Sequence, residues 1–277
     1  MAVDSVAHTF RVALMVCAVC AVLVSGAAVG LRQQQLANKD REKKANILQA
    51  AGLSDLAARE GVESLFRQRV EVRLIDLQQG ELVSEPRAES YDPRRALRDP
   101  TQSEPVPADQ DVARVRRREK WAPVYLIKDS QGNVELLVLP IRGYGLWSTL
   151  WGFVALDAPS IVRGPEHVTI RGITYYEHGE TPGLGGEVDN PAWKSKWVGK
   201  RVYDENWQVR LHVIKGEVRP DDHEAPYKVD GLSGATLTSN GVSNMLAFWF
   251  GPEGYLPFLQ KLHQQPHLLP TRGASRG

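Results

Sequence analysis

Twenty consecutive residues, 12–31, carry no charged side chain, and this run limits what the chain can fold into more than any other feature. A helix of that length rises about 30 Å, which is enough to cross the hydrocarbon core of a bilayer. Arg11 and Arg32 flank the run. The sequence therefore predicts a short N-terminal segment over 1–11 and one transmembrane helix over 12–31.

A cleaved signal peptide is the alternative interpretation of this run. The small residues S-G-A at 25–27 give an A-x-A-like arrangement, but the apolar core of a signal peptide is usually about 7–15 residues long. We therefore favour a retained anchor. The positive-inside rule would then place the C-terminal body in the cytoplasm, because the basic residues after the run outnumber Arg11 and the free amine before it. They are Arg32, Lys39, Arg41, Lys43 and Lys44.

Charge and cysteine content exclude several classes of function. The formal net charge of +1 argues against nucleic acid as a partner, since a surface that follows phosphates needs a basic excess. The basic run at 114–120 is interpreted as a solvated loop or helix face. Both cysteines, Cys17 and Cys20, fall inside the apolar run, so the remainder of the chain can build no disulfide or cysteine-ligated cluster. We interpret them as small apolar residues and leave a redox role open.

The rest of the chain predicts a stalk followed by a compact body. Residues 32–120 are interpreted as a stalk and membrane-proximal region, with a helix that ends at Gly52, a second helix capped by Ser54, a strand over 70–76 and a long Pro-rich loop over 84–111. Residues 121–262 predict an α+β body. The expected strands cover 124–128, 134–141, 151–156, 168–176 and 207–214, and the first two form a hairpin.

Three helices are expected in the same body. One develops between Thr181 and Trp197, one begins at Ser239 and ends at Gly251-Pro252, and a short one covers 255–262. The tail over 263–277 is interpreted as disordered.

The segment D-G-L-S-G-A-T-L-T-S-N-G-V at 230–242 carries the chemistry. Gly231 and Gly234 allow a tight turn and close approach to a bulky group. The hydroxyls of Ser233, Thr236, Thr238 and Ser239 follow where a helix is expected to begin, and the amides of a helix N-terminus favour an anion such as phosphate. The alternative is that these hydroxyls only cap the helix. Asp230 is expected either to fix the turn or to bind metal.

Three motifs of the chain resemble those of the FMN-binding domain family. They are S-G-A-T at 233–236 with its following hydroxyls, H-G-E-T-P-G-L-G-G at 178–186 and G-L-W-S at 145–148. Together with the single N-terminal anchor they resemble the NqrC family, whose members are components of Na+-translocating NADH:quinone reductases, over residues 1–262. The resemblance implies an FMN-binding domain of antiparallel strands and flanking helices after one transmembrane helix.

The resemblance also implies a cofactor and the residues that hold it. FMN would be joined covalently to Thr236 through a phosphoester, attached by a dedicated flavin transferase that uses FAD. The residues implied to border it are Asp230, Ser233, Gly234, Ala235, Leu237 and Thr238 in the first motif, Glu180, Thr181, Gly183, Leu184 and Gly185 in the second, and Leu146, Trp147 and Ser148 in the third. His178 is interpreted as a hydrogen-bonded residue, with proton donation to the reduced flavin as the alternative.

The implied function is an electron relay in the bacterial inner membrane. Neighbouring membrane subunits would pass electrons from NADH to ubiquinone with export of Na+, and the body would lie on the periplasmic side, since large domains translocate with less regard for flanking charge. G-Y-G-L-W-S lacks the third glycine of a dinucleotide fingerprint, so no NADH site is expected in this chain. The alternatives are an Rnf-type electron-transport protein, a stand-alone anchored flavoprotein, or a non-redox assembly module in which Thr236 caps a helix.

Overall fold

The computed structural model describes residues 6–84, 86, 88 and 91–269. By its internal contacts the chain divides into two units, residues 1–43 and 44–277. Helix α1 (Val6–Ala50) contains the predicted span and is long and apolar enough to cross a membrane. Its apolar side chains in that stretch are exposed, as they would be in a helix that faces lipid. The expected end at Gly52 is confirmed, with φ at +73° just beyond the helix.

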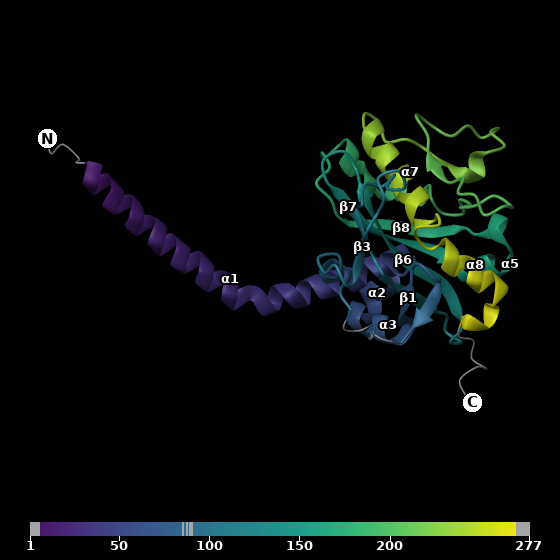
Figure 1. The fold of residues 1–277 in the computed structure, drawn as a ribbon, viewed down its shortest axis with the longest axis horizontal. Helices are drawn as coiled ribbons and strands as arrows, with labels where there is room; N and C mark the ends of the chain where they lie inside the picture. Colours follow the sequence, from purple (N-terminus) through teal and green to yellow (C-terminus); the bar gives the residue numbers. More distant parts are fainter. Residues whose placement is uncertain (1–5, 85, 87, 89–90, 270–277) are drawn as a thin grey trace. The chain divides into compact units, whose positions relative to one another are not determined.

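The second unit is built on one antiparallel sheet of six strands in the order β2-β1-β5-β6-β7-β8 (Figure 1). The strands are β1 (Val70–Asp76), β2 (Glu81–Val83), β5 (Trp121–Lys128), β6 (Val134–Tyr144), β7 (Thr149–Asp157) and β8 (Ile170–Glu177). The predicted antiparallel α+β class is confirmed, as are the predicted hairpin and the strand over 70–76.

Both faces of this sheet are buried, and successive side chains along a strand enter different cores. In β5, Leu126 packs into the larger core with helices α7 (Thr236–Trp249) and α8 (Leu256–Gln264), whereas Ile127 packs into a smaller core with the end of α1. This is the period of two that a pleated strand imposes. Strands buried on both faces contain near-continuous apolar runs such as V-E-L-L-V-L-P-I, which is why they could be predicted.

Shorter elements complete the unit. They are α2 (Ser54–Glu60), α3 (Val62–Arg69), α4 (Pro93–Ala96), β3 (Ser103–Pro105), β4 (Arg117–Glu119), α5 (Ala158–Arg163), η2 (Pro165–His167), η3 (Gly185–Asp189), α6 (Pro191–Ser195), β9 (His212–Val213), η4 (Ala225–Tyr227), β10 (Lys228–Val229) and η5 (Pro266–Leu268).

Several expectations before residue 121 need correction. Strands β1 and β2 belong to the main sheet, so much of 32–120 is part of the second unit instead of a stalk. Leu53, not Ser54, holds the N-cap position of α2, and no side chain caps it. The described part of the Pro-rich loop contains α4 and β3. The basic run at 114–120 is not wholly solvated either, because Arg118 and Glu119 in β4 are buried.

Two expectations at the C-terminal end are also wrong. The strand predicted over 207–214 reduces to β9, which pairs in parallel with β10 outside the main sheet. Trp207 adopts a positive φ of 60° and interrupts the extended backbone there. Residues 263–269 are not a disordered tail, since α8 continues to Gln264 and Leu269 is buried against the larger core. The remainder of that predicted tail lies outside the described residues.

Candidate functional site

Helix α7 begins at Thr236, three residues earlier than its sequence predicts. Thr236 is therefore the first helical residue, and its side chain is exposed. Ala235 holds the N-cap position, where it offers no side-chain acceptor, and the first turn contains no acidic residue. Gly234 precedes it with φ at +70°, a conformation that favours glycine. The N-terminal amides of a helix of 14 residues thus have no side-chain cap or carboxylate of their own in that turn.

The other hydroxyls of this segment divide by burial. Thr238 is fully buried and its Oγ1 donates to Glu180 Oε2 at 2.6 Å. Ser239 is buried and its Oγ accepts from the backbone amide of Leu232 at 3.1 Å. Ser233, like Thr236, is exposed. Only these last two hydroxyls of the four can meet a group that approaches from solvent.

Glu180 joins the three motifs at one carboxylate. It is 5% exposed, and its Oε1 accepts from the backbone amides of Leu146, Trp147 and Ser148 at 3.0, 2.9 and 3.3 Å. Its other oxygen, Oε2, accepts a hydrogen bond from the hydroxyl of Thr238. One side chain therefore joins the loop of its own motif to the G-L-W-S loop and to the first turn of α7.

Glycines permit this close approach. A Cβ at Gly145 would lie 2.6 Å from Glu180 Oε1, and a Cβ at Gly185 would lie 2.6 Å from Thr238 Oγ1. Gly183 has φ at +75° and lies in a tight turn. In this turn the carbonyl of Thr181 accepts from the backbone amides of residues 184 and 186, at 3.1 and 2.9 Å. Any larger residue at positions 145 or 185 would displace the carboxylate.

A second layer of contacts positions Glu180. Its backbone amide donates to His178 Nδ1 at 3.2 Å, and His178 Nε2 lies 2.7 Å from Asp189 Oδ2. Since Nδ1 accepts, the ring proton lies on Nε2 and is donated to the aspartate. Gly179 donates its amide to Ser148 Oγ at 2.6 Å. His178 is thus the hydrogen-bonded residue that its sequence context suggested.

Asp230 serves the turn. Its carboxylate pairs with Lys196 and accepts from the amide of Val218 at 2.8 Å, while its carbonyl accepts from Trp193 Nε1 at 2.8 Å. Burial raises the pKa of this carboxyl, but the hydrogen bonds and the positive charge of Lys196 outweigh that effect and lower it below its usual value. These contacts are the ones expected of a residue that fixes the turn.

Four large apolar side chains from the three motifs are exposed. Trp147 is 66% exposed and Leu237 is 59% exposed, and Leu146 and Leu184 are also largely accessible. A Cβ at Gly234 would lie 2.9 Å from Leu184 Cδ2, so the second motif lies directly against the first. Exposed apolar side chains on neighbouring segments are typical of a binding surface. Trp147 in particular is not a core residue.

Two glycines that the sequence analysis did not single out seat α7 on the sheet. A Cβ at Gly241 would lie 2.5 Å from Tyr144 O, and a Cβ at Gly143 would lie 2.7 Å from Met245 Cβ. A glycine within a helix is the available signal, because it often marks close packing. Helix α7 therefore approaches the end of β6, where G-L-W-S begins.

Known proteins with similar sequences and folds point in one direction. A model of the FMN-binding domain matches residues 145–251. The NqrC component of the Na+-translocating NADH-quinone reductase of Pseudomonas aeruginosa is 45% identical over 94% of this chain and 97% of its own length. The corresponding protein of Yersinia pestis is 44% identical over 94% of each.

Solved structures agree with these sequence matches. The crystal structure of Shewanella oneidensis NqrC is similar with a TM-score of 0.71 and 33% identity, over 82% of this chain and 100% of that one. The NqrC component of the Na+-translocating NADH-quinone reductase from Parabacteroides distasonis gives a TM-score of 0.58 and 28% identity, over 83% and 96%.

Proposed function

The chain belongs to the NqrC family of the Na+-translocating NADH-quinone reductases, and from this premise we propose that it carries FMN as a phosphoester on Thr236 and relays electrons within such a complex. The observation that carries the proposal is an exposed threonine at the first position of α7, beside exposed apolar side chains from three motifs.

The start of α7 fits the phosphate end of the cofactor. Helix amides and the positive end of the helix macrodipole stabilise an anion at this position. No acidic side chain stands in the first turn to oppose it. Ser233, Gly234 and Ala235 form the approach to the helix, where glycine at positive φ lets the backbone turn beside the ester. The Thr236 oxygen then fixes the cofactor to the chain.

The exposed apolar side chains fit the ring system of the cofactor. Leu146, Trp147, Leu184 and Leu237 would cover apolar parts of the isoalloxazine, and the glycine-rich turn around Gly183 would let backbone approach its face. Bound FMN supplies the electron-transfer chemistry, while the protein positions it. Because the supporting loops are held by Glu180, the chain sets the ring position through buried contacts.

The ionisable side chains of the three motifs are engaged in other contacts. The oxygens of Glu180 accept from backbone amides and from the Thr238 hydroxyl. Asp230 pairs with Lys196, and His178 bonds Asp189 and the amide of Glu180. An alcohol is a weak nucleophile without an adjacent base. This supports attachment by a separate flavin transferase.

The relatives' names supply the rest of the proposal. They name a reductase that uses NADH and quinone and translocates Na+, which favours this complex over an Rnf-type one. We propose that the chain lies in the bacterial inner membrane, with α1 as a single anchor in lipid, other membrane subunits as partners, ubiquinone as the final acceptor and the body in the periplasm. A compartment-sensitive reporter fused to the C-terminus tests that side, and a signal only from the cytoplasm contradicts it.

The ester is tested in full-length chain expressed with the transferase. We expect a flavin-fluorescent band on a denaturing gel, a peptide containing Thr236 that carries the mass of FMN, and loss of both in Thr236→Val. Ser233→Ala is the matched control, because it removes the other exposed hydroxyl and should keep the band. An unmodified peptide in the wild-type protein, or a full band in Thr236→Val, refutes the proposed attachment.

A further inference from the structure

Residues 111–116, here called the arginine loop, lie at the same end of the sheet as the site. The backbone amide of Tyr144 donates to the carbonyl of Ala113 at 2.9 Å. Tyr144 is the last residue of β6, its carbonyl lies against α7 at Gly241, and the next residue begins G-L-W-S. The arginine loop is therefore one backbone hydrogen bond away from the loop that carries Trp147.

The arginine loop is held in a conformation that arginine rarely adopts. Arg114 and Arg116 have φ values of 54° and 63°. A non-glycine residue in this region is strained, and the conformation persists only where its surroundings impose it. Here Asp111 imposes it, since its carboxylate accepts the amides of Val115 and Arg116, each at 2.7 Å. Strain maintained by a dedicated side chain indicates that the shape of this loop is used.

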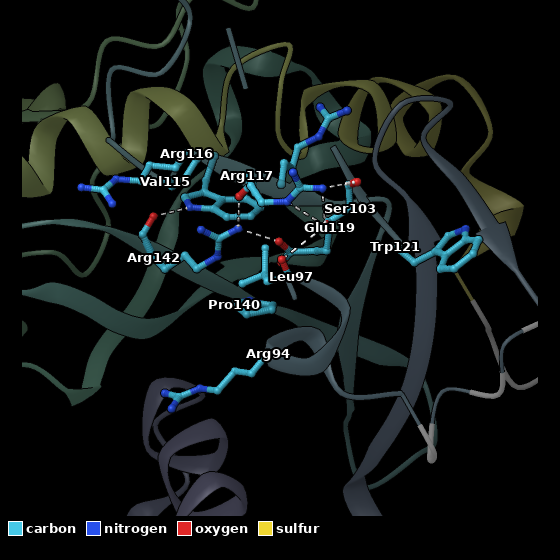
Figure 2. Close-up of polar contacts among 12 residues, drawn as sticks. Arg94, Leu97, Ser103, Val115, Arg116, Arg117, Glu119, Trp121, Pro140 and Arg142 are labelled. Atoms are coloured by element: carbon cyan, nitrogen blue, oxygen red, sulfur yellow. Dashed lines mark hydrogen bonds and ion pairs between the residues drawn. The ribbon is translucent and has the colours of Figure 1, made fainter. Parts of the chain in front are cut away.

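A buried ion pair holds the segment that follows the arginine loop. Arg142 of β6 donates from Nη2 to Glu119 Oε2 at 2.7 Å and to the carbonyl of Arg117 at 2.8 Å (Figure 2). Arg117 in turn donates to Ser103. The side chains of Arg142 and Arg117 are therefore engaged in contacts within the protein. The segment that follows the arginine loop is consequently fixed to the strand that leads into the site.

Arg114 and Arg116 differ from Arg117 and Arg142 in their exposure and contacts. Both are exposed, and within the described part of the chain neither forms an ion pair. In Figure 2 the side chain of Arg116 extends away from the buried Arg142–Glu119 pair. Val112, beside them in the loop, is 48% exposed. The loop therefore presents two accessible positive charges and one apolar side chain on a held backbone, beside the half-buried carboxylate of Asp111. The formal net charge of the whole chain is only +1.

We propose that the arginine loop docks an acidic surface on the protein that exchanges electrons with the cofactor of this chain. The inference rests on the proposed function, because the loop matters only if the neighbouring site is an electron-transfer site. Opposite charges steer two proteins into register and raise the rate of productive encounter more than they raise affinity. Two exposed arginines on a backbone that Asp111 holds, beside an exposed apolar site, are suited to such a brief contact.

The test uses the assembled complex with Arg114→Glu and Arg116→Glu combined. Flavin absorbance is followed after rapid mixing with NADH, and the phase that belongs to this chain is identified as the earliest of the phases missing from a Thr236→Val complex. We expect this phase to slow about tenfold at low ionic strength, and the wild-type phase to slow as salt is added while the variant changes little. Arg59→Glu with Arg67→Glu, two exposed arginines on α2 and α3, is the matched control and should behave as wild type.

Three results overturn the docking surface. One is a variant with the wild-type rate and salt profile, and another is equal slowing by the control pair. The third is slowing that occurs only in vesicles containing anionic lipid and vanishes in neutral lipid, which would make the membrane the occupant. The fluorescent band on a denaturing gel separates the two proposals, because its presence in the variant keeps the ester while the loop is judged, and its absence from wild type removes the proposed function first.

Discussion

Replacing Glu180 by alanine should destabilise the second unit and disorganise the site. The substitution removes the acceptor for the amides of Leu146, Trp147 and Ser148 and for the hydroxyl of Thr238. Those four donors come from two separate segments of the chain. Alanine offers them no replacement acceptor.

The size of the effect depends on which of these donors can find another hydrogen-bond acceptor. The three amides belong to a turn with exposed side chains, so water can replace much of what they lose. The Thr238 hydroxyl is fully buried, and an unsatisfied buried donor costs about 1–3 kcal/mol. With a further 1 kcal/mol or so for the turn, the free energy of unfolding should fall by about 3 kcal/mol. For a unit of this size that is roughly 6–12 °C in Tm.

The measurement is thermal unfolding of full-length chain in detergent, with flavin loading scored on a denaturing gel. Glu180→Gln should lose less, because the amide oxygen still accepts from the turn. Glu187→Ala is the control, since this residue lies in the same loop and its carboxylate only accepts from Asn190. A shift below about 2 °C for Glu180→Ala, or an equal shift for the control, would show that this carboxylate does not hold the motifs together.

Three further predictions concern the surroundings of the site. Gly185→Ala should lower Tm by several degrees, since its Cβ would lie 2.6 Å from Thr238 Oγ1. Lys196→Ala should make the free energy of unfolding less dependent on pH at acid pH. Because the pKa of Asp230 is lowered in the folded protein, its contribution to stability is present above the ordinary aspartate pKa and is lost as pH falls through the folded value. Unfolding measured from pH 6 to pH 3 checks this. Glu119→Gln should cost about 3–5 kcal/mol in chemical denaturation, because a buried guanidinium loses its partner.

The main sheet could be predicted because each of its strands has a recognisable local sequence pattern. Runs such as V-E-L-L-V-L-P-I are apolar on both faces, and the turn D-S-Q-G-N separates them. The strand expected over 207–214 failed for a reason that no local pattern contains. Its alternation is real, but Trp207 turns the backbone, and the sheet ends at β8 without it. Pairing partners are a property of the whole fold.

The contacts of the site were less predictable than its residues. Glu180 belongs to a motif that the sequence displays, yet its bonds reach residues 32 to 58 positions away. No periodicity encodes such distances. The arginine loop was harder still, because positive φ values at Arg114 and Arg116 contradict the preference of the residue type. The clue in the sequence was Asp111, a residue able to accept from amides ahead of it.

The start of α7 decides which hydroxyl meets the solvent. Successive helical residues are turned by about 100°, so Thr236 and Thr238 point in nearly opposite directions. The first is exposed, and the second is buried against Glu180, whose carboxylate accepts a hydrogen bond from the Thr238 hydroxyl. A run of four hydroxyls cannot reveal this phase, since a start at Ser239 would leave the first three of them in a loop. Given the observed start, Thr238 cannot take over when Thr236 is replaced: exposing its oxygen would require breaking the bond that holds the three motifs together.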